Sequence, residues 1–552
     1  MSKETPKLLI IGWDGATFDV IDPLLARGEL PHLAGLIARG VRGRLRSTVP
    51  PSSAVAWPTF ATGRDPAGHG VFGFYQTETT SYQRRLVSSR DVHAPCLWDW
   101  LGAAGLRAGV VNVPVTYPPR PMHGFLVSGM LTPSPQETFT YPAELGPQLL
   151  ARQPAFPIES QVMHAVHGAR SRGELAQIIT AWTDAFHANV CHLLAGQDWD
   201  CFVVVYRATD IVQHGLGLPQ PGASDGDEVQ QTYRQIDACL GALLARVPAD
   251  TNVVLVSDHG AGPAHGRFMA NNWLYQRGYL RLRRGAGLLS KLPAWRRVPL
   301  QRALHRLRLG ALARRLPSAL STWPAPAPRK RHAHDLIDWR RTRVFIPTTG
   351  VQGLPLRLNL AGREPLGCVR PDGEAQTLLT ELARELEALR APDGQPLLTV
   401  VWQVEGDANR LLSNRGPDLL ALPREACYYS IGAKLDLSRP LLAGPARRAP
   451  GQHRLEGVLV AAGPAIAPGL RLEGARLVDV APTALHLLGL PTPAEMDGRV
   501  LAEALRPEWL ASHPPRVEAW SMEGSAGAAG SAYDAADAAR VEGALRALGY
   551  LE

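Results

Sequence analysis

Residues 252–260 read Asn252-Val253-Val254-Leu255-Val256-Ser257-Asp258-His259-Gly260. The first five are rich in valine and lack polar alternation, which is typical of a strand buried on both faces of a parallel sheet. This strand ends in a turn that carries a carboxylate and an imidazole. In open α/β sheets, ligands gather beyond the carboxyl ends of the strands. The stretch therefore predicts the fold class and the sheet edge where the chemistry takes place.

Four further apolar runs end in a polar residue or a turn, namely Leu8–Trp13, Ala108–Val111, Phe202–Tyr206 and Gly457–Ala462. Helical patterns occur at Cys96–Ala104, Gly173–Leu194, Asp227–Arg246, Glu374–Leu389 and Asp479–Leu488. Strands that alternate with helices over such distances predict an α/β core in which a mostly parallel sheet is sandwiched by helices.

Length and composition exclude several classes of protein. The chain has 552 residues, 45% of them hydrophobic, so it is no mini-protein. Its six cysteines are scattered without a CxxC pair, which argues against a cysteine metal site and requires no oxidising compartment. The N-terminal apolar run Leu8–Ile11 is too short for a signal peptide, and no apolar stretch is long enough to span a bilayer. We therefore expect a cytoplasmic protein.

The net charge of +8 is concentrated in one segment. Residues 281–334 contain 14 lysines and arginines and no acidic residue, so the remaining chain has 44 basic and 50 acidic residues. This segment is either a solvated arginine-rich face or a surface for an anionic substrate or an anionic membrane. Its only aromatic residues are Trp295 and Trp323, and it lacks a nucleic-acid motif, so no specific nucleic acid is expected as a partner.

The chain is expected to divide into three parts. Residues 1–280 and 420–510 form the catalytic core, and residues 281–419 form an insertion with a basic helical cap and a hairpin. The hairpin is predicted from Val344–Ile346 and Leu354–Leu360. Residues 511–552 are interpreted as a C-terminal tail.

Candidate metal ligands follow the predicted strands. Asp210 and His214 are four residues apart, so a helix places both on one side, where they can form half of a zinc site. Asp258 and His259 offer two more ligands at a strand end. His453, before another buried strand, could complete one site, and Asp14 the other. Each residue alone is more often a cap, turn or core residue, but the set is far more specific than its members.

A candidate phosphate site follows the run Thr48-Val49-Pro50-Pro51-Ser52-Ser53. The two prolines favour an extended approach, and the small apolar residues after Ser53 can begin a helix. A hydroxyl at a helix start lies among free N–H groups at the positive end of the helix dipole, which stabilises a phosphate. Helix capping by Ser52 or Ser53 is the simpler role, and the two roles are compatible.

Together these motifs resemble the type I phosphodiesterase/nucleotide pyrophosphatase family of the alkaline phosphatase superfamily. The resemblance extends over about residues 7 to 500 and rests on the following stretches: Trp13–Gly15, Pro51–Gly70, Asn112–Pro114, Asp210–His214, Ser257–Gly260, Asn272–Leu274, Gly451–His453, Asp479–Thr483 and Met496–Gly498.

The resemblance implies an alkaline-phosphatase-like core and two divalent ions, with zinc expected and manganese as the alternative. One ion would be held by Asp210, His214 and His453. The other would be held by Asp14, Asp258, His259 and the hydroxyl of Ser53. Ser53 occupies the family's nucleophile position, and its attack on phosphorus would form a covalent phosphoseryl intermediate that water hydrolyses.

The chain departs from the family pattern at two positions. Nucleotide pyrophosphatases usually have Thr where this chain has Ser53, and Asn where it has Ala56. Another donor must then hold the phosphate oxygen. Asn112 and Asn272 are candidates, although roles in turns or caps fit them at least as well. Sulfatases need a C/S-x-P-x-R motif that residues 53–57 lack, and we recognise no inserted domain of the cofactor-independent phosphoglycerate mutases.

The sequence thus predicts a two-metal phosphoric ester hydrolase that acts on a small phosphorylated substrate, of phosphodiesterase or nucleotide pyrophosphatase type. The alternative is a phosphomonoesterase or phosphotransferase of the same superfamily. The extra negative charge of a monoester would favour an added arginine in the pocket, and Arg207 or Arg64 could supply it. A noncatalytic protein with this fold is the remaining rival.

Overall fold

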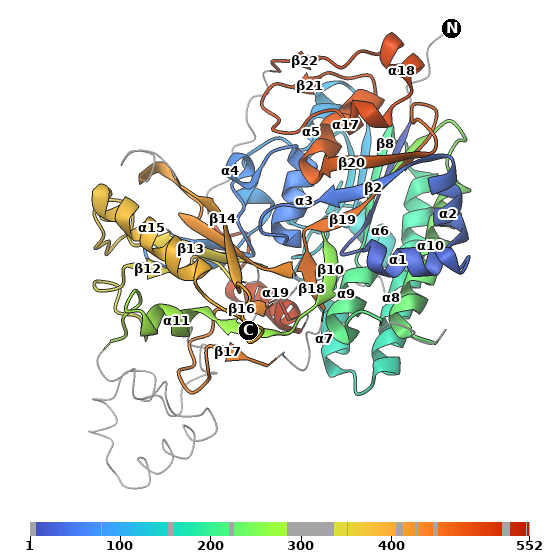
Figure 1. Cartoon of the computed structure of the whole chain (residues 1–552). Coiled ribbons are helices and arrows are strands. Elements are labelled where there is room, and N and C mark those ends of the chain that lie inside the picture. Colours follow the sequence, from blue (N-terminus) through green and yellow to red (C-terminus); the bar gives the residue numbers. More distant parts are fainter. Residues whose placement is uncertain are drawn as a thin grey trace.

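The computed structural model describes residues 7–78, 80–152, 159–219, 226–283, 336–349, 352–404, 412–425, 429–444, 451–520, 530–547 and 549–550. Of the predicted basic segment 281–334, only residues 281–283 are among them. The prediction of a basic helical cap therefore falls outside the described residues. Figure 1 shows a large body that contains the N-terminal half of the chain and a smaller lobe beside it.

The large body is built on a nine-stranded sheet with the order β20-β2-β19-β9-β1-β8-β5-β6-β7. The five strands from β9 to β6 run parallel, whereas β19 is antiparallel to both of its neighbours and β7 is antiparallel to β6. In sheet order, the strands are Leu470–Arg476, Gly40–Arg46, Glu456–Ala462, Asn252–Val256, Leu8–Trp13, Cys201–Tyr206, Ala108–Val111, Gly124–Val127 and Thr140–Tyr141. The predicted mostly parallel sheet is confirmed.

The strand predicted from each apolar run is present. β1, β5 and β9 have the predicted bounds, and β8 and β19 begin one residue earlier. Strand β2 was not predicted, because its buried Val41, Gly43 and Leu45 alternate with arginines. Such alternation belongs to a strand with one face near solvent, so a search for continuous apolar runs passes over it.

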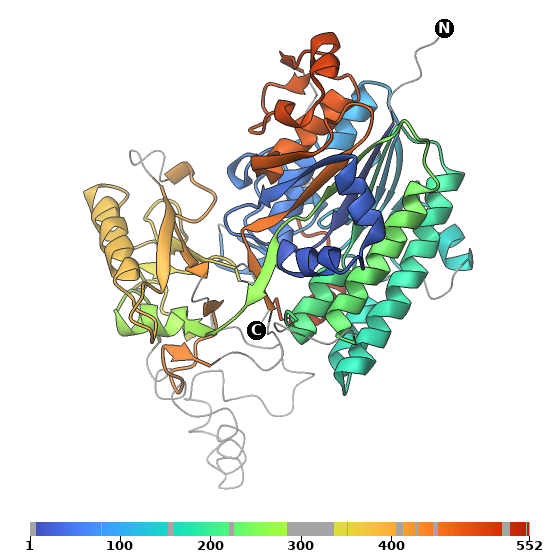
Figure 2. The same ribbon diagram turned by 45° about the vertical axis from the view of Figure 1, so that its right-hand side comes forward.

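Helices cover both faces of the sheet (Figure 2). Helix α2 packs against β19 and β2, and α8 packs against β8 and against α9 and α10. A second group, α3, α5 and α17, is mutually packed, with α5 against β5. These helices span Pro31–Ala38, Arg172–Gly196, Ala208–Leu216, Glu228–Leu244, Ser53–Thr62, Leu97–Ala103 and Val480–Leu487. The helices predicted in this body lie within two residues of these bounds.

The smaller lobe has its own hydrophobic core. Its sheet has the order β12-β13-β15-β14 and is covered by α15. The strands are Val344–Phe345, Leu354–Leu358, Leu419–Pro423 and Leu398–Gln403, and the helix is Gly373–Glu387. The predicted hairpin is confirmed, since β12 and β13 pair antiparallel.

A hairpin of the large body joins the two parts. Between β3 (Tyr75–Thr77) and β4 (Arg84–Leu86), Tyr82 enters the core of the smaller lobe. Its ring stacks on Trp339 at a centroid distance of 3.9 Å, and its hydroxyl donates to Asn359 Oδ1 at 2.6 Å. The smaller lobe is therefore fastened to the catalytic body by a buried aromatic contact.

The C-terminal residues fold back onto the large body. Strand β22 (Val517–Glu518) pairs with β21 (Thr492–Pro493), and helix α19 (Ala535–Ala547) packs against α7 (Glu159–Gly168). The end of the chain lies near the centre of the molecule (Figure 1). The predicted domain boundaries remain a prediction. In the part of the chain described, no helix has the length and apolar character needed to cross a membrane.

Candidate metal centre

The site lies at the carboxyl ends of three neighbouring strands, β9, β1 and β8. Asp14 directly follows β1, Asp258 and His259 follow β9, and Asp210 lies on α9 just after β8. Gly15, which follows Asp14 after β1, must be a glycine because it lies very close to Asp210. Its φ is +66°, and a Cβ there would lie 3.0 Å from the Cβ of Asp210. The expectation that chemically capable side chains follow the strands at this edge is confirmed.

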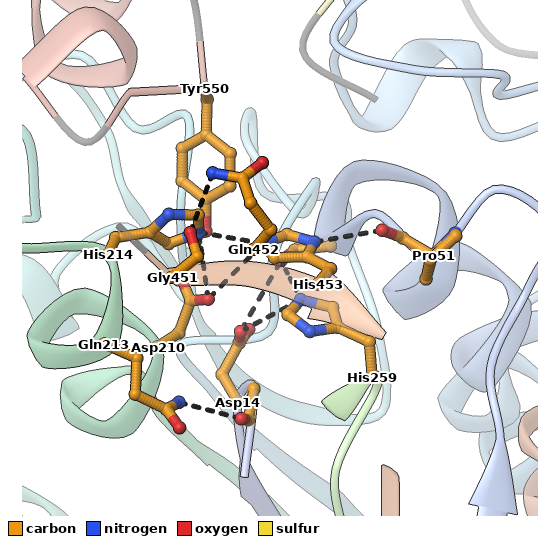
Figure 3. Close-up of polar contacts among 12 residues, drawn as sticks. Asp14, Pro51, Asp210, Gln213, His214, His259, Gly451, Gln452, His453 and Tyr550 are labelled. Carbon is orange, nitrogen blue, oxygen red and sulfur yellow. Dashed lines mark hydrogen bonds and ion pairs between the residues drawn. The ribbon is translucent and has the colours of Figure 1, made fainter. Parts of the chain in front are cut away.

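The first ligand group consists of Asp210, His214 and His453, whose donor atoms lie within 4.8 Å of one another. Asp210 and His214 share one side of α9, and His453 comes from β18 (Gly451–Arg454). Asp210 Oδ1 lies 3.3 Å from His214 Nε2 and 3.5 Å from His453 Nε2 (Figure 3). A carboxylate and two imidazoles thus converge on one point.

The second ligand group consists of Asp14, Asp258 and His259, and it has the same compactness. His259 Nε2 lies 3.3 Å from Asp258 Oδ2 and 3.7 Å from Asp14 Oδ1. These three side chains are fully buried. Burial and the nearby carboxylates Asp14 and Asp210 raise the pKa of Asp258 well above its usual range.

Backbone carbonyls hold two histidines in the tautomer that suits a metal ligand. Nδ1 of His259 lies 3.0 Å from the carbonyl of Gly260, and Nδ1 of His453 lies 2.9 Å from that of Pro51. Nδ1 of each ring must carry the proton in order to donate, so Nε2 offers its lone pair to the site. Burial lowers the pKa of His259 to about 4 and that of His453 to about 3, which keeps both rings neutral near pH 7.

The donor atoms fit a divalent cation. Asp258 Oδ2 is buried and has no hydrogen-bond partner, and an unpaired buried carboxylate oxygen is costly unless a cation balances it. Neutral imidazole and carboxylate ligands in groups of three suit zinc, and also manganese. Each group can therefore hold a metal ion.

Ser53 lies beside the second group, at the first residue of α3. Its Oγ is 3.1 Å from His259 Nε2 and 3.5 Å from Asp14 Oδ1. The predicted start of a helix at Ser53 is confirmed. This places the hydroxyl at the positive end of the helix dipole, where negative charge on oxygen is stabilised.

Arg207 occupies the space between the two groups. Its guanidinium is fully buried, and Nη1 lies 2.6 Å from Asp14 Oδ2 and 3.4 Å from Ser53 Oγ. Nη2 lies 3.1 Å from Glu159 and 3.4 Å from Asp210. Arg207 and Arg64 were both candidates for a cation in the pocket, and Arg207 lies in the site. Arg64 instead lies 3.4 Å from Asp497.

The two asparagines considered for substrate binding have other partners. Asn112 donates from its amide to the carbonyl of Val205 at 2.9 Å, and Asn272 donates to that of Asp436 at 2.7 Å. These contacts fix loops and do not involve either ligand group. Substrate binding by Asn112 and Asn272 remains a prediction.

Sequence reasoning missed three residues that touch this centre. Trp57 donates from its indole to Asp14 Oδ2 at 2.7 Å, and Glu159 pairs with Arg207. Tyr550 donates from its hydroxyl to Asp210 Oδ2. Trp57 lies one turn after Ser53 on the same helix, which was a usable signal. Nothing near Glu159 or Tyr550 in the sequence points to the site.

Comparisons with known proteins agree with this geometry. The family model described as type I phosphodiesterase / nucleotide pyrophosphatase matches residues 8–444, which include every ligand except His453. A short stretch of 47 residues is 55% identical to a 2,3-bisphosphoglycerate-independent phosphoglycerate mutase of Cereibacter sphaeroides. It covers only 8% of this chain and 9% of that protein.

Two solved structures share the fold. Human ectonucleotide pyrophosphatase / phosphodiesterase 5 is 14% identical, with a TM-score of 0.50 over 91% of this chain and 100% of that one. Phosphonoacetate hydrolase from Sinorhizobium meliloti, in complex with phosphonoacetate, is 16% identical, with a TM-score of 0.52 over 88% and 95%. At these identities the likeness establishes the alkaline-phosphatase-like fold alone.

The family match covers most of the chain and all members of the two ligand groups except His453, and these groups suit the metal-dependent chemistry of that family. The chain belongs to the type I phosphodiesterase / nucleotide pyrophosphatase family of the alkaline phosphatase superfamily, and it is a hydrolase of phosphoric ester bonds.

Proposed function

We propose that this protein is a two-metal phosphodiesterase with Ser53 as its nucleophile and zinc in both ligand groups. The position of Ser53 carries the proposal, since its Oγ lies 3.1 Å from His259 Nε2 and 3.5 Å from Asp14 Oδ1. Asp14, Asp258, His259 and Ser53 would hold one ion, and the other ligand group the second. Bound zinc would supply charge neutralisation at phosphorus and would favour the ionised form of the serine hydroxyl.

The protein's own groups have defined roles in this reaction. Oγ of Ser53, once deprotonated, attacks phosphorus while the bond to the leaving oxygen breaks, which gives a phosphoseryl intermediate. Arg207 Nη1, 3.4 Å from this oxygen, and the start of α3 stabilise its negative charge. Water then cleaves the phosphoserine and restores the hydroxyl.

A phosphomonoesterase is the second candidate, because Arg207 is the kind of added cation that the charge of a monoester would favour. The contacts of Arg207 argue against that use. Its guanidinium already bonds to Asp14, Glu159 and Tyr550, so its donors are engaged within the protein. We therefore favour a diester substrate.

The test compares kcat/KM for a nitrophenyl phosphodiester with that for the matching monoester, on zinc-loaded enzyme. The variants are Ser53→Ala and the matched control Ser52→Ala. Ser52 is a buried neighbour whose Oγ has no hydrogen-bond partner, so the control removes the same atom one residue away. We expect a diester preference of about tenfold or more, about 1.4 kcal/mol in transition-state free energy, that is lost only in Ser53→Ala.

The possible outcomes separate the alternatives. Full activity in Ser53→Ala would refute the covalent route, and a monoester preference in the unaltered enzyme would favour the phosphomonoesterase. Two ions per chain with no turnover on either ester would favour the noncatalytic rival. Elemental analysis of the same samples identifies and counts the ions.

A further inference from the structure

Each ligand group contains a carboxylate whose two oxygens have different surroundings. Asp14 turns Oδ1 toward His259 Nε2 at 3.7 Å, whereas its Oδ2 accepts from Trp57 Nε1 at 2.7 Å and from Arg207 at 2.6 Å. We call the oxygen that faces the ligand group the inner oxygen and the other the outer oxygen. Protein donors thus hold the outer oxygen of Asp14 and leave its inner oxygen for an ion.

Asp210 repeats this division with a different donor. Its inner oxygen Oδ1 lies 3.3 Å from His214 Nε2 and 3.5 Å from His453 Nε2. Its outer oxygen Oδ2 accepts from the hydroxyl of Tyr550, and Arg207 Nη2 lies 3.4 Å from it. Tyr550 is therefore the neutral donor that fixes how this carboxylate is turned.

Tyr550 reaches the site from the end of the chain. It follows α19 and the positive-φ residue Gly549, and its backbone N–H donates to the carbonyl of Leu545 at 3.0 Å. The side chain is buried, and its ring packs edge-on against His214, with centroids 4.8 Å apart, and against His453, at 5.7 Å (Figure 3). One residue therefore touches all three members of the first ligand group.

Such a contact has a defined consequence for metal binding. A carboxylate with a free outer oxygen can turn about its bond to Cβ, which directs the inner oxygen away from the ion. Outer donors that prevent this rotation pre-orient the ligand, and their loss typically lowers metal affinity 10- to 100-fold. The ring contacts with His214 and His453 restrict these two ligands in the same way.

We propose that Tyr550 is a positioning residue of the metal centre, through which the C-terminal segment holds Asp210 in the orientation required by the ion bound with His214 and His453. The inference rests on the proposed function, because it needs an ion in this group. It makes α19 and the end of the chain part of the site. The rival is that Tyr550 only blocks the entry of substrate.

The test uses Tyr550→Phe in the full chain, which keeps the ring and changes no charge. Tyr533→Phe is the matched control. Tyr533 lies in the same C-terminal segment and is also buried, but its hydroxyl donates to the carbonyls of Val87 and Leu131. Each protein is stripped of metal, and its two zinc affinities are measured by competition with a chromophoric chelator. His214→Ala identifies which affinity belongs to the first ligand group.

We expect Tyr550→Phe to weaken the zinc affinity of the first ligand group 10- to 100-fold and to change the other zinc affinity by no more than about twofold. In the metal-free state, Tyr550→Phe should lower the thermal stability of the protein no more than Tyr533→Phe does. In cobalt-loaded protein, the visible absorption bands of the affected site should shift, because they report ligand geometry. If Tyr550 only supported the fold, its loss would not selectively change the zinc affinity or the cobalt absorption bands of the first ligand group.

Each of the following results would overturn the inference. If Tyr550→Phe has unchanged zinc affinities and a higher turnover, Tyr550 only blocks the entry of substrate. If Tyr550→Phe weakens both zinc affinities equally, or if Tyr533→Phe causes the same loss of zinc affinity, the effect is a general one on the fold. If the unaltered protein binds no zinc, the proposed function fails together with the inference. If it binds two ions and Tyr550→Phe does so equally well, the inference alone fails.

Discussion

Mild acid should destabilise the catalytic body through one buried histidine outside the metal centre. His69, at the end of α4 (Pro66–His69), is fully buried. Its Nδ1 accepts from the N–H of Val71 at 3.2 Å, so the neutral ring carries its proton on Nε2, 2.9 Å from Thr59 Oγ1. Burial, with smaller contributions from Arg64 and His93, lowers the pKa of His69 from 6.5 to about 3.

The sign and size of the effect follow from this difference in pKa. Below pH 6.5 the unfolded chain gains a proton at His69 that the folded protein does not take up, so stability is lost as the pH falls. At pH 5 the pH is about 1.5 units below the pKa that His69 has in the unfolded chain. At about 1.4 kcal/mol per unit, His69 lowers the free energy of unfolding by about 2 kcal/mol relative to neutral pH.

Urea unfolding followed by tryptophan fluorescence checks this value, at pH 7.5 and pH 5.0 and with excess chelator. The variants are His69→Gln and, as a control, the exposed His192→Gln. His69→Gln should cost about 1–3 kcal/mol at pH 7.5, because it disturbs the contacts with Thr59 and Val71. Its loss of stability between the two pH values should be about 2 kcal/mol smaller than that of the unaltered protein. Equal losses in both proteins would refute the reasoning.

Two further predictions concern the joint between the lobes and the metal centre. Tyr82→Phe removes the hydroxyl that donates to Asn359 and accepts from the Leu366 N–H. It should destabilise the smaller lobe by about 1–3 kcal/mol, measured by hydrogen exchange of the amides of this lobe. Unchanged protection of these amides would contradict this prediction. Because the pKa of Asp258 is raised, protons compete with zinc for it, so zinc affinity should fall as the pH is lowered. Asp258→Asn should lose one ion and much of this pH dependence; two ions retained in elemental analysis would contradict it.

Much of the fold could be predicted because its signals are local. Strands β1, β5 and β9 are continuous apolar runs, and a strand buried on both faces must be apolar throughout. Strand β2 escaped because its arginines alternate with buried residues. The end of the chain was interpreted as a tail, because residues 511–552 have no feature that indicates where they pack.

The candidate site, too, could be predicted only in part. Asp14, Asp210 and Asp258 follow buried strands directly, and parallel strands bring such positions to one edge, so their convergence could be expected from the sequence. His453 was a candidate because it precedes a buried strand, but the sequence pattern alone did not show which group it joins. The structure brings it to Asp210 by pairing β18 with β10 (Gly260–Pro263), almost 200 residues earlier.

The sequence by itself determined which strands are buried, which polar residues end them and which ligand chemistry these residues offer, because each property depends on a few consecutive residues. Only the tertiary structure decided that Arg207 links both ligand groups and that Tyr550 holds Asp210, 340 residues away. The contact of Tyr550 depends on how α19, which precedes it, packs against α7. Such packing is set by the shape and burial of whole helices, which no local pattern records.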